Sequence, residues 1–148
     1  MKLISILIPA YNEEAVLDQL MVRLGNLAND TKDYDFVFPF INDGSKDRTL
    51  EIIKGFAETD PRVSYINLSR NFGKEIGMIA GLDHVQGDAT VIIDADLQDP
   101  PELIPQMIKF WEEGYDDIYA KRNSRDGETW FKKFTSKQYY KTLQRVTH

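Results

Sequence analysis

Two aspartates, Asp94 and Asp96, follow an apolar run at residues 91–93 that has the composition of a buried strand. Side chains two apart in an extended segment point to the same face. The two carboxylates therefore converge at the end of the strand, where they repel each other unless a proton or a cation lies between them. Such oxygen ligands suit Mg²⁺ or Mn²⁺. The alternative is a solvated turn in which Asp99 or the two prolines after it begin a helix.

Polar residues also follow three other predicted strands. The carboxyl ends of the strands of a parallel sheet lie along one edge, which is where such sheets bind ligands. We therefore expect four polar segments to meet in space. They are residues 9–13 (Pro-Ala-Tyr-Asn-Glu), 42–45 (Asn-Asp-Gly-Ser), 70–74 (Arg-Asn-Phe-Gly-Lys) and 94–96 (Asp-Ala-Asp).

The elements that position these segments alternate between strand and helix. Hydrophobic runs predict strands at residues 3–8, 35–41, 63–68, 89–93 and 117–120. Helical periodicity predicts helices at residues 12–28, 48–58, 74–85 and 101–111. Asn12 is the expected N-cap of the first helix and Asp47 of the second, and Pro39 suggests an edge strand or a bulge. This order predicts an α/β fold with a mostly parallel sheet and helices on both faces.

Composition narrows the class of protein. The 148 residues are enough for one domain with a real core, and we expect a single domain over residues 1–148. The net charge of −6 argues against a nucleic-acid partner, and the lack of cysteine excludes disulfides and thiolate chemistry. Neither a signal peptide nor a membrane span is evident. Residues 129–148 read as a helix without a stop signal, so we expect the domain to be truncated at its C-terminal end.

The four polar segments together resemble the inverting glycosyltransferases of family 2. The similarity covers residues 3 to about 141 and is carried by residues 8–14, 42–49, 70–75 and 94–102 in that order. Within the family it is closest to the polyprenyl-phosphate branch, which contains dolichol-phosphate mannose synthases and undecaprenyl-phosphate glucosyltransferases. The resemblance implies a fold of the GT-A type and a nucleoside-diphosphate sugar as donor.

It also implies roles for individual residues. Asp43 would contact the nucleotide base, although the segment around it is equally good turn chemistry. The implied donor-binding residues are Pro9, Ala10, Tyr11, Glu13, Asp43, Gly73, Lys74, Asp94 and Ala95. The implied metal ligands are Asp94, Asp96 and Gln98, and the implied catalytic residues are Asp94, Asp96, Arg122 and Arg125.

Several of these roles have a plain alternative. Glu13 either takes the ribose hydroxyls or only favours a helix N-terminus. Lys74 and Arg70 either contact the donor or are solvated surface charges. Arg122 and Arg125 resemble a basic loop that grips phosphates, but they also fit an exposed charged loop. The aromatic and cationic residues of 130–140 fit either an ordinary amphipathic helix or one that lies on an anionic membrane.

The predicted reaction is metal-dependent transfer of a hexose, with inversion, to a polyprenyl phosphate at the cytoplasmic face of the membrane. Residues 128–133 resemble the glucosyl branch, which favours UDP-glucose. A phosphate acceptor is already ionised near neutral pH, so no base is needed. The alternatives are a glycosyltransferase that extends a cell-surface saccharide, a nucleotide-binding fragment without turnover, and a nucleotidyltransferase, which would normally need a glycine-rich phosphate loop. The sequence leaves homo-oligomerisation open.

Overall fold

A computed structural model describes residues 1–98, 100–122 and 129–135 of the chain. The chain forms two compact units, residues 1–101 and residues 102–148. In the described residues no helix is long and apolar enough to cross a membrane.

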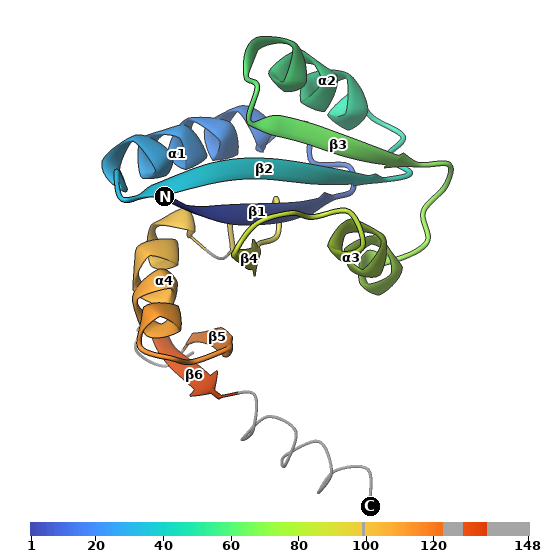
Figure 1. Cartoon of the computed structure of the whole chain (residues 1–148). Helices are drawn as coiled ribbons and strands as arrows, with labels where there is room; N and C mark the ends of the chain where they lie inside the picture. The colour runs from blue at the N-terminus through green and yellow to red at the C-terminus, as the bar shows by residue number, and fades with distance from the viewer. Residues whose placement is uncertain (99, 123–128, 136–148) are drawn as a thin grey trace, which may run out of the picture. The chain divides into compact units, whose positions relative to one another are not determined.

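The first unit is built on a parallel sheet. Its strands are β1 (Lys2–Ala10), β2 (Tyr34–Asp43), β3 (Val63–Leu68) and β4 (Ala89–Ile92), in the order β3-β2-β1-β4. All three pairings are parallel, and the arrowheads of β1, β2 and β3 point the same way in Figure 1. The predicted parallel α/β sheet is confirmed for these four strands, with β3 at the predicted residues.

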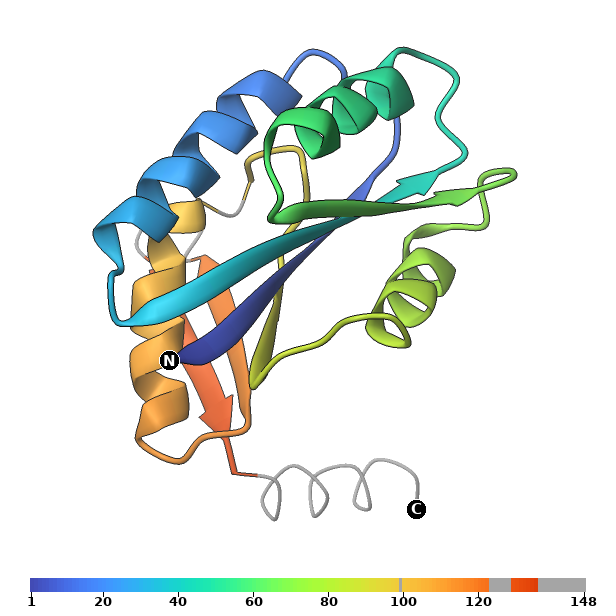
Figure 2. The same cartoon turned by 45° about the horizontal axis from the view of Figure 1, so that its top comes forward.

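Helices cover both faces of this sheet, as predicted. The helices α1 (Leu17–Asp30) and α2 (Thr49–Thr59) pack on one face, and α3 (Lys74–Leu82) packs on the other (Figures 1 and 2). The chain moves outward from β1 through β2 to β3, then returns across β1 to reach β4. The strand order therefore reverses between β1 and β4, and such a switch point is where open α/β sheets form a crevice for ligands.

The core of this unit consists of aliphatic and aromatic residues on β1 and β2 and on the inner faces of the helices. Residues 4–10 of β1 are all buried, as is expected for a central strand that is covered on both faces. Helix α3 approaches the sheet closely through its glycines. A Cβ atom at Gly81 would lie 2.7 Å from Leu7 Cδ1 and 3.0 Å from Ile41 Cδ1.

Pro39 does not mark an edge strand or a bulge, so that prediction is wrong. Strand β2 lies between β1 and β3, and Pro39 pairs with Ser64 of β3. The register of β1 with β2 is the same before and after the proline, from Ser5 opposite Val37 to Ile8 opposite Phe40. Proline lacks an N–H donor, but the parallel register is maintained on both sides of it.

Helix α1 begins later than predicted. Asn12 has a φ of 52°, and the N-cap of α1 is Val16 rather than Asn12. The left-handed backbone at Asn12 turns the chain before the helix, because asparagine tolerates this conformation better than most residues. Glu13 and Glu14 are therefore not in the first turn of α1, where Asp18 is the acidic residue.

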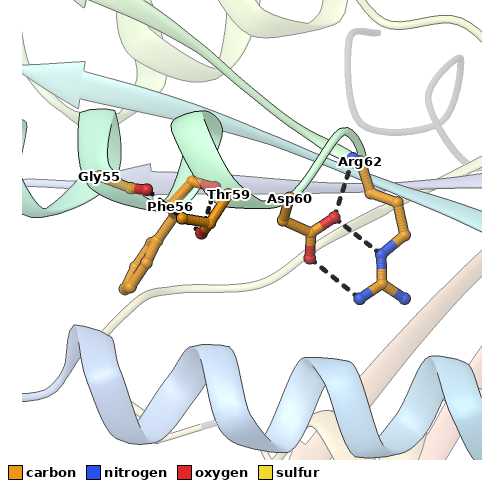
Figure 3. A network of polar contacts seen from close by, with 5 residues as sticks. All are labelled: Gly55, Phe56, Thr59, Asp60 and Arg62. Atoms are coloured by element: carbon orange, nitrogen blue, oxygen red, sulfur yellow. Dashed lines mark hydrogen bonds and ion pairs between the residues drawn. The ribbon is translucent and has the colours of Figure 1, made fainter.

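A compact ion pair links α2 to β3. Asp60 accepts hydrogen bonds from Arg62 Nε at 3.0 Å, from Arg62 Nη2 at 2.9 Å and from the Arg62 backbone N–H at 2.9 Å (Figure 3). The Arg62 guanidinium also lies 5.2 Å from the centre of the Phe38 ring. At the preceding residue, the Thr59 hydroxyl lies 3.4 Å from the carbonyl oxygens of both Gly55 and Phe56, which share its one hydrogen (Figure 3). These bonds fix the turn that returns the chain to the sheet.

The second unit contains a helix and a hairpin. The short 3-10 helix η1 (Pro101–Leu103) leads into α4 (Ile104–Glu112), which is followed by β5 (Asp117–Arg122) and β6 (Thr129–Phe134). The strand predicted at residues 117–120 is confirmed by β5, which pairs antiparallel with β6 in a sheet of their own.

The predicted helix at residues 129–148 is wrong where it can be compared, because residues 129–134 form β6. The rest of that prediction, residues 136–148, lies outside the described residues. In the hairpin, Lys133 Nζ lies 3.9 Å from the centre of the Phe110 ring, and the rings of Phe110 and Phe131 are 5.3 Å apart. Helix α4 and β6 therefore share an aromatic contact with a lysine over it.

Candidate active site

A pocket of about 280 Å³ opens at the carboxyl ends of the strands of the first unit. Its walls come from the segments that follow β1, β2, β3 and β4, so the four polar segments do meet at one edge of the sheet. The residues that line it are Pro9, Ala10, Tyr11, Glu13, Asp43, Asn71, Gly73, Asp94, Ala95 and Asp96.

Most of the predicted site residues lie in this pocket. The exceptions are Lys74, Gln98, Arg122 and Arg125. The backbone of Lys74 begins α3 and that of Arg122 ends β5, but both side chains, and all of Arg125, lie outside the described part of the structure. Gln98 is exposed, and its backbone N–H donates to Asp96 Oδ1 at 3.1 Å. The roles of these four residues stay predictions.

In the turn after β2, two neighbouring residues have different roles. Asn42 is buried, accepts the Ser45 N–H through its side-chain oxygen at 3.4 Å and donates to Asn67 Oδ1 at 2.8 Å. Asp43 is 4% exposed, lines the pocket and accepts the Phe72 N–H through Oδ1 at 2.8 Å. The turn bond is therefore made by Asn42, and the carboxylate of Asp43 is oriented toward the site by the loop after β3.

Gly44 allows the loops after β2 and β3 to touch. Its φ is 68°, and a Cβ atom there would lie 2.2 Å from both the carbonyl carbon of Arg70 and the nitrogen of Asn71. Only glycine fits such an approach of backbone to backbone. Arg70 itself lies with its guanidinium 4.7 Å from the centre of the Phe72 ring. This contact gives Arg70 a structural partner outside the pocket lining.

The segment after β4 turns sharply at the pocket. Ala95 is buried and Asp96 is exposed, and Leu97 has a φ of 65°. The Asp96 carboxylate accepts the Gln98 N–H, a bond that stabilises this turn. The predicted alternative of a turn is thus present, and its two aspartates nevertheless face a cavity.

The pocket is strongly acidic. Burial and the neighbouring carboxylates of Asp96, Asp47 and Asp94 raise the pKa of Glu13 above its ordinary value. Among the described residues that line the pocket there is no lysine or arginine. A polyanionic ligand would therefore enter a negative field unless a cation came with it.

The donor set fits a hard divalent cation. Carboxylate oxygens are the ligands that Mg²⁺ and Mn²⁺ prefer, and the carboxylates of Asp94, Asp96 and Glu13 line the same pocket. In the described residues no group of three or more acidic, histidine or cysteine side chains is arranged to hold a metal. An ion bound by the two aspartates would need further oxygens from its ligand or from water.

Two features of the site go beyond the sequence predictions, which placed Asn71 in the polar segment 70–74 but gave it no role. Asn71 lines the pocket, and its Oδ1 accepts the Gly73 N–H at 2.9 Å. Its position two residues before a glycine at a strand end was the available signal. The other feature is a set of hydrogen bonds between residues 12–14 and residues 45–49, which join segments more than thirty positions apart. No local sequence signal indicates such pairs.

Solved structures share the fold of this chain. The mannosyltransferase PcManGT from Pyrobaculum calidifontis, in complex with GDP-Man and Mn²⁺, is 22% identical with a TM-score of 0.66 over 83% of this chain and 36% of its own. S. aureus TarS 1-349, in complex with UDP-GlcNAc, is 23% identical with a TM-score of 0.61 over 86% of this chain and 37% of its own. The fold of this chain is therefore that of the GT-A glycosyltransferases.

The sequence comparison specifies the family. The model of glycosyl transferase family 2 matches residues 5–148, and this chain belongs to that family. It is 50% identical over 143 residues to the uncharacterized glycosyltransferase YkcC of Bacillus subtilis (strain 168), covering 97% of this chain and 44% of the relative. It is 41% identical over 144 residues to the bactoprenol glucosyl transferase of Shigella phage SfX, covering 97% and 47%. The chain thus spans less than half the length of these relatives. The predictions of family, fold class and enzyme class are confirmed.

Proposed function

We propose that this chain binds a nucleoside-diphosphate hexose, with UDP-glucose favoured, and transfers the hexose with inversion to a polyprenyl phosphate. The observation that carries the proposal is the acidic pocket at the switch point of the sheet. It places a carboxylate on each of three strand-end segments, Glu13, Asp43 and the pair Asp94 and Asp96, around one cavity. The name of the phage relative, a bactoprenol glucosyl transferase, supports the glucosyl donor and the lipid acceptor.

The geometry at Asp43 favours uridine over guanosine. One oxygen of this buried carboxylate already accepts the Phe72 N–H. Uracil presents one donor, N3–H, which the other oxygen suffices to accept. Guanine presents two adjacent donors, which would use both oxygens of the carboxylate, so that Oδ1 would have to accept from the base and from the Phe72 N–H together. Tyr11, which is 40% exposed beside Pro9, offers a flat apolar surface to the base.

Asp94 and Asp96 would hold the Mg²⁺ or Mn²⁺ ion, with Gln98 as a further candidate ligand. Bound there, the ion would neutralise charge that develops on the leaving diphosphate. Glu13 lies beside this pair and is the candidate to accept hydrogen bonds from the ribose hydroxyls. Its alternative role at a helix N-terminus is wrong, because α1 begins at Leu17.

The transfer itself requires little acid–base chemistry from the chain. An oxygen of the acceptor phosphate attacks the anomeric carbon, a new carbon–oxygen bond forms, and the bond to the β-phosphate breaks with its electron pair on the departing UDP. The acceptor is ionised near neutral pH, because its second pKa is about 6. We propose that Arg122 and Arg125 contact phosphates and that the reaction occurs at the cytoplasmic face of a membrane, where a polyprenyl phosphate resides.

Calorimetric titration tests the donor site. UDP and GDP would be titrated into the chain with and without Mn²⁺, and the titrations repeated on Asp96→Ala and on the control Asp33→Ala, which removes an exposed carboxylate outside the pocket. We expect UDP binding that depends on Mn²⁺, is at least tenfold stronger than GDP binding, and is lost only in Asp96→Ala. Equal binding by both aspartate variants would contradict the assignment.

Turnover tests the acceptor. Release of UDP from UDP-glucose would be measured with a short-chain polyprenyl phosphate and, in parallel, with a saccharide acceptor. Release only with the lipid phosphate supports the proposal, and release only with the saccharide indicates a saccharide-extending enzyme. Nucleotide binding without release in either case indicates a nucleotide-binding fragment.

A further inference from the structure

A set of hydrogen bonds joins the loop after β1 to the start of α2, and we call it the clasp. It connects residues 12–14 with residues 45–49. Its members are Asn12 N–H to Ser45 Oγ at 3.0 Å, Lys46 N–H to Asn12 Oδ1 at 2.9 Å, Glu13 N–H to Thr49 Oγ1 at 2.8 Å, Glu14 N–H to Asp47 Oδ2 at 3.3 Å and Arg48 N–H to Glu14 Oε2 at 3.2 Å.

The buried member of the clasp is Thr49, the first residue of α2. Its side chain is fully buried, and its hydroxyl lies 2.5 Å from Asp47 Oδ1 and 2.8 Å from the Glu13 nitrogen. A hydroxyl has one hydrogen to donate. Because an ionised carboxylate accepts only, Thr49 donates to Asp47 and offers a lone pair to the Glu13 N–H. The direction of this two-bond chain is therefore fixed.

Asp47 is well suited to anchor this chain. Although partial burial works in the opposite direction, the hydrogen bonds from the Thr49 hydroxyl, the Thr49 N–H and the Glu14 N–H lower the pKa of Asp47. The carboxylate is thus ionised at neutral pH. An ionised acceptor makes stronger hydrogen bonds than a neutral one, which strengthens the hold on the hydroxyl.

The loop that the clasp holds is not held by regular structure. Strand β1 ends at Ala10 and α1 begins only at Leu17. Between them, Asn12 has a positive φ, a backbone conformation that residues other than glycine adopt infrequently. The same loop brings Tyr11 and Glu13 to the pocket. Without an external anchor, the unusual backbone of Asn12 would favour a different loop conformation.

We propose that Thr49, anchored by Asp47, is a positioning residue for donor binding: its buried hydroxyl fixes the Glu13 backbone and thereby the wall of the pocket formed by residues 11–13. Thr49 does not line the pocket, so it acts through the loop and not by contact with the ligand. This inference rests on the proposed function in one respect, namely that the ligand is a nucleoside diphosphate.

Three variants separate positioning from stability. Thr49→Val removes the hydroxyl at nearly constant shape, and Thr49→Ser keeps it. Ile53→Val is the matched control, because Ile53 is fully buried one turn later on α2 and makes only apolar contacts through its side chain. Titration of UDP with Mn²⁺ gives the affinity, thermal unfolding gives the stability, and amide hydrogen exchange reports on residues 12–14.

We expect Thr49→Val to weaken UDP binding about tenfold and to speed amide exchange at residues 12–14. Thr49→Ser should stay within about threefold of wild type in both measurements. Ile53→Val should lower the melting temperature without either effect. A folded Thr49→Val protein with wild-type affinity and wild-type exchange would overturn the proposal.

Two further outcomes are also decisive. If Thr49→Val does not fold, Ser45→Ala takes its place, because it removes the acceptor of the Asn12 N–H from a half-buried position. Faster exchange with weaker UDP binding would then support the clasp, and no change in either would overturn it. If the wild-type chain binds no nucleotide, the proposed function fails. The exchange data then still decide whether the Thr49 hydroxyl holds the loop.

Discussion

Substitution of Asp43 gives the most direct test of how the donor base is recognised. Replacing it with asparagine keeps the size of the side chain and one oxygen for the Phe72 N–H, but it directs an amide donor toward the ligand in place of an oxygen. A hydrogen bond to a charged group contributes about 1.5–3 kcal/mol. We therefore expect Asp43→Asn to weaken UDP binding by roughly 10- to 100-fold and to leave the melting temperature nearly unchanged, as measured by calorimetry and thermal unfolding.

The Asp43→Asn substitution should also reduce the preference for UDP over GDP, because it removes the carboxylate oxygen that accepts the hydrogen bond from the base. An Asp43→Asn protein that binds UDP as tightly as wild type would show that this carboxylate serves only to join the loops after β2 and β3.

The raised pKa of Glu13 should make the stability of the folded chain depend on pH. Burial and its acidic neighbours raise its pKa above the ordinary value of 4.5, so between these two values the folded chain holds a proton that the unfolded chain has lost. Stability from this group therefore falls as the pH rises through that window. We expect Glu13→Gln to unfold at a higher temperature than wild type at pH 7 in the presence of a chelator, and the difference to disappear below about pH 4.5.

Asp60 is the control with the opposite sign. The side-chain hydrogen bond from Arg62 lowers the pKa of Asp60 against the effect of burial. The stability that the ionised Asp60 contributes is fully present above its ordinary pKa of 3.8. It is lost as the pH falls through the lower pKa that Asp60 has in the folded chain. Asp60→Asn should therefore lower the stability at pH 7 by about 1–2 kcal/mol. If both variants shifted stability in the same direction, the carboxylate repulsion at Glu13 would not be the cause.

At the scale of elements, the packing of α3 on the sheet depends on a glycine. A Cβ atom at Gly81 would contact Leu7 and Ile41 at 3.0 Å or less, and both belong to the packed core. Overpacking of this kind costs about 1–3 kcal/mol. Gly25 in α1 is the matched control, because nothing lies within 4 Å of a Cβ atom there. We expect Gly81→Ala to lower the free energy of unfolding in urea, and Gly25→Ala to raise it by roughly 0.5–1 kcal/mol. Equal effects of the two alanines would mean that α3 does not depend on this close approach.

Elements with an unambiguous hydrophobic pattern were predictable from the sequence, and those with two compatible patterns were not. The run at residues 63–68 is short, apolar and β-branched, and β3 occupies it. In residues 129–134 the aromatic and basic side chains fit a period of two as well as a helical one, and only the partner strand β5 decides between them. Asparagine is a common N-cap residue, but the side chain of Asn12 instead accepts the Lys46 N–H in the clasp.

The candidate site was more predictable than the loops that hold it. The parallel order of the strands brings their carboxyl ends together, so the sequence alone places polar segments such as those at Asp43 and Asp94 at one edge. The clasp could not be predicted, because hydrogen bonds such as that from the Glu13 N–H to the Thr49 hydroxyl depend on the relative positions of two segments that are distant in sequence. Buried polar pairs of this kind leave no periodic signal in the sequence.

At the scale of the whole molecule, charge determines how the ligand is bound. The chain carries a net charge of −6, and the described lining of the pocket contains four carboxylates, those of Glu13, Asp43, Asp94 and Asp96, and no basic residue. A diphosphate brought into this field without a cation is repelled, and a diphosphate brought with Mn²⁺ is attracted. Salt screens both interactions, since the screening length falls from about 10 Å at 0.1 M to about 3 Å at 1 M.

The salt dependence of UDP affinity should therefore change sign with the metal. Between 0.1 M and 1 M salt we expect UDP to bind about two- to fivefold more tightly in the absence of divalent ions, and more weakly by a similar factor in the presence of Mn²⁺. Uridine carries no charge and is the control, with an affinity that should change little in either condition. If UDP binding weakened with salt even without metal, cations such as Lys74, Arg122 or Arg125 would dominate the field at the diphosphate. The metal would then assist a site that the basic side chains already make attractive, and substitution of Arg122 and Arg125 by alanine would restore the opposite salt dependence.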